Sequence, residues 1–439
     1  MTPARETVDE RPIPATSGHA GLSHTGMSRR SMVIAALSTI VEWYDFTLYL
    51  YFATVLARVF FGGTASSLLI TLGGFAVAYL LRPLGALVFG HIGDRFGRRP
   101  MMLLSMALMS LAMLATALLP SYKAVGPIAG GLLLLLRCVM GFSVGGEYTG
   151  VVAYLLEGAP ARRRGLVTSC ASAASEVGGL LAVAVSASTV HLLDAADLES
   201  WGWRIPFLAG AALAGTVWIA RAGMQESPDF ERQAATGAMP TRPLRHALAH
   251  HRTGILRSFA ISALGSITYY VGITYVPAFL TSAGSLSEGM SLWLSTGAAL
   301  VVIAVTPIIG ALSDQWGRKP VLLALALCGV LMPIPLFQLM ASGSAGLAMV
   351  GAALLAAVAG GVSAVGAVAT AEQFPGEGRL TGLALGATGA TALFGGLTPF
   401  VAQALVARTE WPPVPGAMIA LVALAVLPVL ARAPETRPR

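Results

Sequence analysis

The sequence predicts an all-α membrane protein whose twelve transmembrane helices form two pseudo-symmetric six-helix bundles. Hydrophobic residues make up 55% of the 439 residues and charged residues only 11%, and the mean hydropathy is +0.73. A soluble chain of this length needs far more surface charge. The apolar residues come in blocks long enough to cross a hydrocarbon core of ~30 Å, and the two halves of the chain repeat each other.

Each crossing needs roughly 20 predominantly apolar residues. The segments that meet this requirement are 31–57, 66–92, 100–119, 126–157, 165–193, 204–224, 254–284, 290–313, 320–341, 346–373, 380–407 and 414–432. The longest polar stretch separates the sixth from the seventh. The predicted organisation follows the chain as a tail at 1–28, a bundle at 29–224, a linker at 225–253, a second bundle at 254–432 and a tail at 433–439.

The basic residues predict the orientation in the membrane. Lys and Arg gather in loops that an even number of helices places on one side, and the opposite loops carry little more than Arg58, Lys123, Arg204 and Arg408. Cytoplasmic loops are enriched in these residues. We therefore expect a multi-pass protein of the cell's inner membrane with both termini in the cytoplasm. The net charge of +7 then reflects topology, and no nucleic-acid partner is expected.

Two loop motifs occur once in each half. The segment Gly90–Pro100 recurs as Gly310–Pro320, which repeats an aspartate and an arginine four positions apart. A second motif places a glutamate seven residues before an arginine, after the fourth and again after the tenth span. The charged residues of both motifs are Asp94 with Arg98, Asp314 with Arg318, Glu157 with Arg164, and Glu372 with Arg379. Tandem halves of this kind are typical of one class of transporters.

Further motifs narrow the comparison to a family. In chain order they are Glu42-Trp-Tyr-Asp45-Phe46, Arg82-Pro83-Leu-Gly85, Gly141 to Tyr148, Trp201 to Phe207, and Tyr275-x-Pro277. Together with the repeated loops they resemble the metabolite:proton symporter family of the major facilitator superfamily, over residues 29–432. The resemblance implies the major facilitator fold, a monomer in the bilayer, and uptake of a small solute together with protons. Members take up α-ketoglutarate, citrate, shikimate, aromatic acids, proline or betaine.

Acidic residues inside spans are costly and indicate function. Glu42 and Asp45 lie three residues apart on one helical face, and Tyr49 continues that face. Two carboxylates in a poorly hydrated site favour the retention of one proton. We expect Asp45 or Glu42 to carry the coupled proton, with a fixed ion pair to an arginine as the alternative. Glu176 in the fifth span is a further candidate proton site, or the mark of a substrate with an amine.

Two embedded arginines are candidates for substrate binding. Arg82 and Arg137 both lie near the middle of the membrane by helix length, stay charged, and form forked hydrogen bonds to carboxylates. Within the resemblance, Arg at position 137 is typical of carboxylate carriers, so a di- or tricarboxylate is the expected solute. The tyrosines expected to line the cavity with Tyr49 are Tyr269, Tyr270 and Tyr275.

The repeated loops are expected to gate the cavity. In the family the Asp94 loop acts as a latch that breaks when the halves rock, and the same role is carried over to its copy and to the glutamate motifs. Glu147 lies about 80° around the helix from Arg137 and is expected to reach the basic loop at Arg98 in a structural or gating role. Gly141 and Gly145 form a stripe that permits close helix approach.

Other functions find little support. A G-x-S-x-G pattern at Gly141–Gly145 lies in an apolar helix and lacks the strand and turn that a hydrolase needs. No phosphate-binding loop or metal-ligand spacing occurs, so neither an enzyme nor a cofactor other than the proton is expected. The alternatives are a proton symporter of a zwitterion of the proline or betaine type, a drug:proton antiporter, although the fifth span lacks the Gly-Pro of that class, and a non-transporting receptor.

Overall fold

The computed structural model describes residues 27–64, 67–237 and 242–437. All regular elements within these ranges are helices. Ten of the described helices are long and apolar enough to cross a membrane. Two bent pairs, Arg252–Thr274 with Val276–Ser282 and Arg318–Leu331 with Pro333–Met340, raise the number to twelve. The predicted fold class is confirmed. Most of the predicted N-terminal tail lies outside the described residues.

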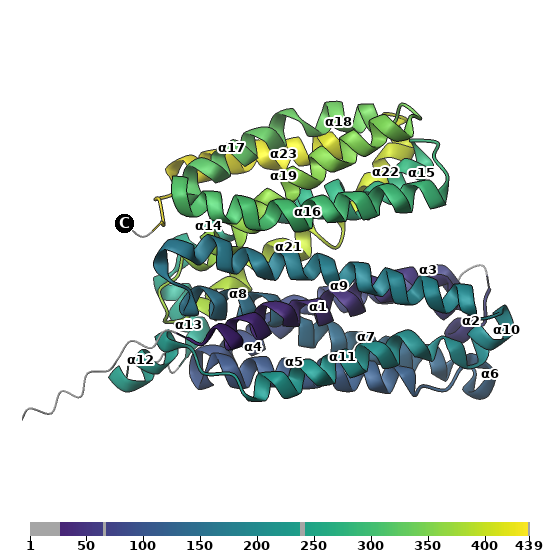
Figure 1. Ribbon diagram of the computed structural model, residues 1–439, viewed down its shortest axis with the longest axis horizontal. Coiled ribbons are helices and arrows are strands. Elements are labelled where there is room, and N and C mark those ends of the chain that lie inside the picture. The colour runs from purple at the N-terminus through teal and green to yellow at the C-terminus, as the bar shows by residue number, and fades with distance from the viewer. Residues whose placement is uncertain (1–26, 65–66, 238–241, 438–439) are drawn as a thin grey trace, which may run out of the picture.

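The first bundle contains the helices that precede the linker. They are α1 (Arg29–Tyr51), α2 (Ala53–Phe61), α3 (Ser67–Leu80), α4 (Arg82–Phe96), α5 (Arg98–Ala117), α7 (Ile128–Val144), α8 (Glu147–Gly158), α9 (Arg164–Leu192) and α11 (Arg204–Ala222), with short turns at α6 (Tyr122–Val125) and α10 (Ala195–Asp197). Figure 1 shows them as the lower, purple to teal group.

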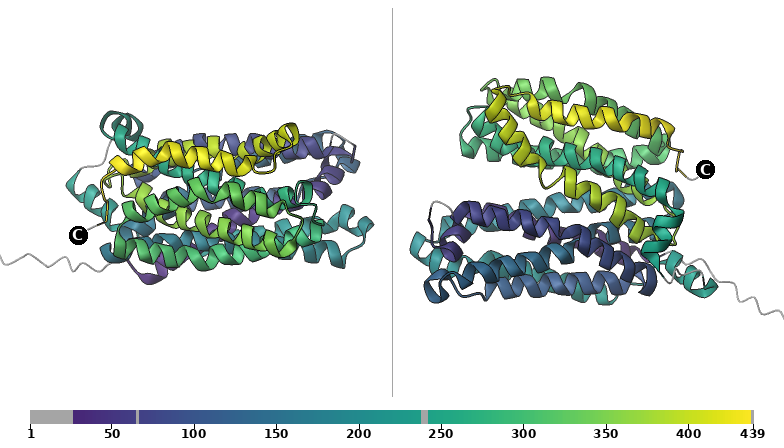
Figure 2. Two further views of the ribbon diagram at one scale, coloured as in Figure 1. Left: turned by 90° about the horizontal axis from the view of Figure 1, so that it is seen from above. Right: turned by 180° about the vertical axis from the view of Figure 1, so that it is seen from behind.

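The linker itself contains two short helices, α12 (Pro228–Thr236) and α13 (Pro243–His250). The second bundle follows. Its helices are α14 (Arg252–Tyr269), α15 (Val276–Ser282), α16 (Glu288–Trp316), α17 (Arg318–Leu331), α18 (Pro333–Met340), α19 (Ala345–Ala371), α20 (Arg379–Leu383), α21 (Gly389–Phe394), α22 (Thr398–Thr409) and α23 (Val414–Arg432). They form the upper, green to yellow group in Figure 1 and in the rear view of Figure 2.

Several spans are broken, and proline explains most of the breaks. Pro83, Pro277, Pro333 and Pro399 lie at the first or second position of the helix that follows a break. Proline has no backbone N–H and its fixed φ suits a helix start, so a span resumes readily there but does not continue through undisturbed. The seventh span also contains a π-helical turn at Tyr270–Thr274.

Glycine lets α7 approach α3 and α4 closely, as the predicted small-residue stripe requires. A Cβ atom on Gly141 would lie 2.0 Å from the carbonyl oxygen of Ala78, and one on Gly145 would lie 2.1 Å from that of Arg82. A Cβ atom on Gly85 would lie 1.8 Å from the carbonyl oxygen of Phe142. Backbone contact at these points excludes any side chain larger than hydrogen, and it fixes the position of Arg82.

The bundles meet along two seams, α9 against α16 and α4 against α20. We call the end of the molecule that carries α12 and α13 the linker end. Both described ends of the chain lie there, since the backbone N–H of Ser28 donates to Gln225 at 3.0 Å and Glu435 accepts from the N–H groups of Arg318 and Lys319. Figure 1 shows the linker end on the left.

Candidate functional site

A cavity of about 170 Å³ lies between the two bundles. Both bundles contribute to its wall, through α1, α3, α4, α8 and α9 on one side and α14, α19 and the α20–α21 segment on the other. The polar and aromatic lining residues include Glu42, Trp43, Tyr79, Arg82, Tyr148, Ser172, Glu176, Ser363, Tyr269 and Tyr270. A site shared by two halves near the middle of the spans is where transporters of this architecture bind solutes.

Glu42 and Arg82 form an ion pair in the cavity wall. The Arg82 Nη2 atom lies 3.3 Å from Glu42 Oε1, and the Arg82 guanidinium also stacks over the ring of Tyr79, 4.6 Å from its centroid. The Oε2 atom of Glu42 has no hydrogen-bond partner within the described chain. The Glu42–Arg82 pair therefore faces the cavity, and the Oε2 atom of Glu42 can still accept a hydrogen bond.

Asp45 and Arg137 form a second ion pair, which is closed to the cavity. Arg137 donates two bonds to the Asp45 carboxylate, at 2.8 and 3.1 Å, and both side chains are buried. The ring of Tyr49 packs 5.1 Å from the guanidinium carbon, and its hydroxyl donates to the backbone oxygen of Thr71. Among the described residues, none of these side chains lines the cavity. The geometry matches the alternative of a fixed pair that joins α1 to α7.

Glu176 projects from α9 into the cavity. Its Oε1 atom accepts a hydrogen bond of 2.5 Å from the hydroxyl of Tyr269 in α14, so this contact crosses between the bundles. A second crossing joins the hydroxyls of Tyr79 and Tyr270 at 2.6 Å. Tyr275 instead bonds Gln403 within the second bundle and does not line the cavity in the described structure.

Glu147 lies in the interior of the first bundle, and its partner is Arg221 rather than the Arg98 loop. The Arg221 guanidinium donates to both carboxylate oxygens, one of them also bonded by the hydroxyl of Ser105, and it contacts Ser38 of α1. These residues come from α1, α5, α8 and α11. The expectation that Glu147 reaches the loop at Arg98 is corrected, because the pair with Arg221 satisfies it inside its own bundle.

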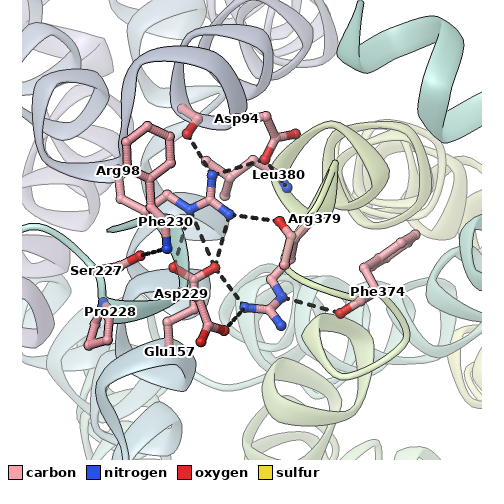
Figure 3. A network of polar contacts seen from close by, with 12 residues as sticks. Asp94, Arg98, Glu157, Ser227, Pro228, Asp229, Phe230, Phe374, Arg379 and Leu380 are labelled. Atoms are coloured by element: carbon pink, nitrogen blue, oxygen red, sulfur yellow. Dashed lines mark hydrogen bonds and ion pairs between the residues drawn. The ribbon is translucent and has the colours of Figure 1, made fainter. Parts of the chain in front are cut away.

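The first latch closes the linker end around Asp94 and Arg98. The Asp94 carboxylate accepts from the backbone N–H groups of Leu380 and Thr381, at 3.2 and 2.9 Å, at the start of α20 in the other bundle. Arg98 pairs with Asp94 and Glu157, and Glu157 pairs in turn with Arg379 at 2.6 Å. Figure 3 shows this network. A carboxylate at a helix N-terminus is favoured by the unpaired amides and the helix dipole.

The second latch repeats the first by pseudo-symmetry. Asp314 accepts from the N–H groups of Gly165 and Leu166, at 2.8 and 2.9 Å, at the start of α9. Arg318 pairs with Asp314 and with Glu372. Within the described residues no ion pair joins Arg164 to Glu372, so the cross-bundle ion pair of the first latch has no counterpart here.

The glutamate motifs therefore have other partners than their own motif arginines. Glu157 pairs with Arg98 and Arg379, and Glu372 pairs with Arg318 and accepts from the hydroxyl of Thr436 at 2.6 Å. Each repeated glutamate thus lies against the Arg98-type arginine of its own half. Sequence spacing could not reveal this, since it holds no information on which loops meet.

Comparison with known proteins agrees with this arrangement. Residues 31–238 match the sugar (and other) transporter family and residues 283–439 match the major facilitator superfamily. The α-ketoglutarate permease of Escherichia coli is 33% identical, with 85% of this chain and 87% of the permease covered. The chain belongs to the major facilitator superfamily.

Other similar proteins agree with the resemblance to the symporters of this superfamily. The glycine betaine/proline/ectoine/pipecolic acid transporter of Dickeya dadantii is 32% identical, with 88% of this chain and 79% of that protein covered. Among solved structures, a proton:xylose symporter superimposes with a TM-score of 0.74 at 22% identity, covering 93% of this chain and 96% of that one. The chain is thus a multi-pass membrane transporter of the major facilitator fold and not an enzyme.

Some residues important to this major facilitator protein were missed in the sequence. Glu226 of the linker caps α5 by accepting from the N–H groups of Arg98 and Arg99, and Glu435 caps α17 in the same way. Asp229 of α12 adds a contact of 3.2 Å to Arg379. Both glutamates follow the last helix of a bundle, which is a positional repeat that could have identified them.

Proposed function

We propose that the protein is a secondary active transporter that takes up a small carboxylate-bearing solute together with protons. The Arg82–Glu42 pair in the cavity wall carries the proposal. The names of the similar proteins, which include an α-ketoglutarate permease and a citrate-proton symporter, support the class of solute and the coupling ion. No further cofactor enters the proposal.

The pair couples solute to proton by competition for one guanidinium. Arg82 stays charged at any relevant pH, so it always needs a counter-charge. When Glu42 takes a proton, its negative charge is lost and a solute carboxylate can replace it beside Arg82. When Glu42 is ionised, the solute has to displace it and also meets its repulsion. Proton and carboxylate therefore favour each other's binding, and by linkage the effect is equal in both directions.

Alternating access would come from rocking of the two bundles. Both latches are formed, so the structure corresponds to the state closed at the linker end. Opening that end requires both aspartates to leave the helix termini that they cap. The basic loops gather at this end, which supports a cytoplasmic location for it and for both termini. Membrane-impermeant labelling of cysteines added at Thr436 and at Thr409 would test this orientation, since only Thr409 should react from outside intact cells.

The decisive experiment is Glu42→Gln in proteoliposomes. The amide mimics the protonated acid, so solute exchange without a gradient should persist near the wild-type rate. Accumulation driven by a pH gradient should fall at least tenfold, because no proton is carried. Arg82→Gln is the matched control and should lose both activities. Gradient-driven accumulation by Glu42→Gln at the wild-type level would remove Glu42 from the mechanism.

A further inference from the structure

The proton mechanism leaves one acid of the cavity unused. Glu176 is 7% exposed and lines the cavity, and its Oε1 atom is held by Tyr269. Its Oε2 atom has no hydrogen bond, and the carboxylate has no ion pair, within the described chain. Burial of this carboxylate is costly unless the group takes a proton or a positive group pairs with it. Within the described residues, Glu176 is thus a hydrogen-bond acceptor that no positive side chain pairs with.

Aromatic side chains surround this acceptor. The rings of Trp43 and Tyr269 meet edge to face with centroids 5.2 Å apart, and Tyr269 and Tyr270 are 5.5 Å apart. Tyr148 lines the same cavity and bonds Ser172, one helical turn before Glu176 in α9. Aromatic faces attract organic cations, and a carboxylate beside them adds a directional acceptor for N–H groups.

A series of tyrosine contacts connects Arg82 to Glu176 along the cavity wall. Arg82 stacks on Tyr79, whose hydroxyl meets Tyr270, and the neighbouring Tyr269 reaches Glu176. A solute that spans this chain of contacts meets a positive group at one end and a negative group at the other. A second solute carboxylate beside Glu176 would face a like charge where water is scarce, which disfavours the binding of a dicarboxylate.

We propose that Glu176, held by Tyr269, forms a subsite for an ammonium group that carries N–H donors, and that the solute is a zwitterion. Its carboxylate binds Arg82, and its primary or secondary ammonium donates to Glu176. This inference rests on the proposed function and narrows its substrate class away from di- and tricarboxylates. It assigns Glu176 to solute recognition and leaves the coupled proton to Glu42.

Calorimetric titration of the purified full-length protein tests the subsite. The probes are 5-aminovalerate, valerate and glutarate, which share a five-carbon chain, and the cyclic pair proline and cyclopentanecarboxylate. In each set the ammonium-bearing member should bind at least about tenfold more tightly than its counterparts. Glu176→Gln should reduce that ratio to within about twofold, whereas the same substitution at Glu42 should keep it. Tyr269→Phe, which retains the acid, should lower the ratio partway if Glu176→Gln does not fold.

The outcomes separate this inference from the proposed function. Equal or tighter binding of the nitrogen-free or dicarboxylate member, failure of every ammonium-bearing probe to bind, or an unchanged ratio in Glu176→Gln would each overturn the subsite. Glutarate accumulated by a pH gradient in a Glu42-dependent manner would overturn the subsite and leave the proposed function standing. Ammonium preference in binding without any gradient-driven uptake would do the reverse.

Discussion

Glu42 and Asp45 lie three residues apart on α1, and each pairs with an arginine of another helix. The surroundings of the two pairs predict different roles for them. Glu42 faces the cavity and accepts a hydrogen bond from Arg82 through one oxygen only. Asp45 accepts from Arg137 through both oxygens and does not line the cavity in the described structure. A partner that can be exchanged suits coupling. A partner that cannot leave suits attachment of one helix to another.

Asp45→Asn should therefore act on stability. It leaves the buried Arg137 without a counter-charge, which costs about 3–5 kcal/mol. The double variant with Arg137→Gln should recover most of this loss, because no uncompensated charge remains. Thermal unfolding in detergent measures both. Glu42→Gln is the control, with a smaller loss because Arg82 borders the cavity. A double variant as unstable as the single one would contradict the assignment of a fixed pair.

At this scale the sequence predicted the kinds of residue but not their partners. Embedded charge drew attention to Glu42, Arg82 and Glu176, which line the cavity, and their functional roles stay predictions. Residues three apart on a helix share a broad face, and only the tilt against neighbouring helices decides which of them meets the cavity. The partner of Glu147 was missed because Arg221 lies at the end of the sixth span, where an arginine is expected from membrane topology alone.

Among the elements, the two latches look alike in sequence but differ in strength. Arg379 joins Glu157 across the bundles and is supported by Asp229 of α12, and its repeat partner Arg164 forms no such ion pair in the described chain. Within the described residues, α12 therefore supports the cross-bundle ion pair of the first latch through Asp229.

Arg379→Gln should shift the molecule toward the state open at the linker end, and Arg164→Gln should change little. The loss of one partly buried charged bond amounts to about 1.5–3 kcal/mol, enough to raise the open population roughly tenfold or more. Pairs of spin labels across the linker end report the two populations. Equal shifts of the open population in both variants would mean that the ion pair of Arg379 does not make the first latch stronger than the second.

Helix α13 should dock less firmly in acid. Burial of the His251 ring, and next the neighbouring His246 and His250, lower the pKa of His251, while Glu377 opposes them. The docked helix thus binds fewer protons than the released one. Docking is stable above the ordinary histidine pKa of about 6.5 and is lost as the pH falls from that value toward the lower pKa of the docked state.

Hydrogen exchange of residues 243–251 checks this prediction. After correction for intrinsic rates, protection should fall from about pH 7.5 to about pH 5.5. His251→Phe should keep the contact with Phe374, whose ring lies 6.3 Å away, and lose most of the pH response. An unchanged response in that variant would contradict the assignment of the effect to His251.

The spans themselves were predictable, because hydropathy over twenty residues averages out local detail. The breaks that contain no proline were not predictable. The π-helical turn at Tyr270–Thr274 has no proline within it, and the short helices of the linker depend on the loops they contact. The predicted boundaries of the tails and linker stay predictions.

At the scale of the whole molecule, the pseudo-symmetry places both latches between the same two bundles. We therefore expect both of them to bias one rocking equilibrium. Asp94→Ala and Asp314→Ala each remove one carboxylate that accepts two backbone hydrogen bonds at a helix terminus, and each should favour the open state by a few kcal/mol. Because the two aspartates share no hydrogen-bond partner within the described residues, their free energies should add within about 0.5 kcal/mol in the double variant. Spin-label distances give the populations. A double variant no more open than either single one would mean that a single latch controls the equilibrium.

The latches have a last consequence for tolerance to mutation. The hydrogen bonds that Leu380, Thr381 and Leu166 donate to the aspartates come from main-chain N–H groups, which nineteen of the twenty amino acids possess. Leu166 is only partly buried, so a substitution there keeps the hydrogen bond unless the new residue is proline, which lacks the N–H group. Leu380 and Thr381 are buried, so their side chains are constrained by packing as well. On the acceptor side only a carboxylate at the right length fits, so a mutational scan should find Asp94 and Asp314 intolerant, whereas Leu166 should tolerate most residues other than proline.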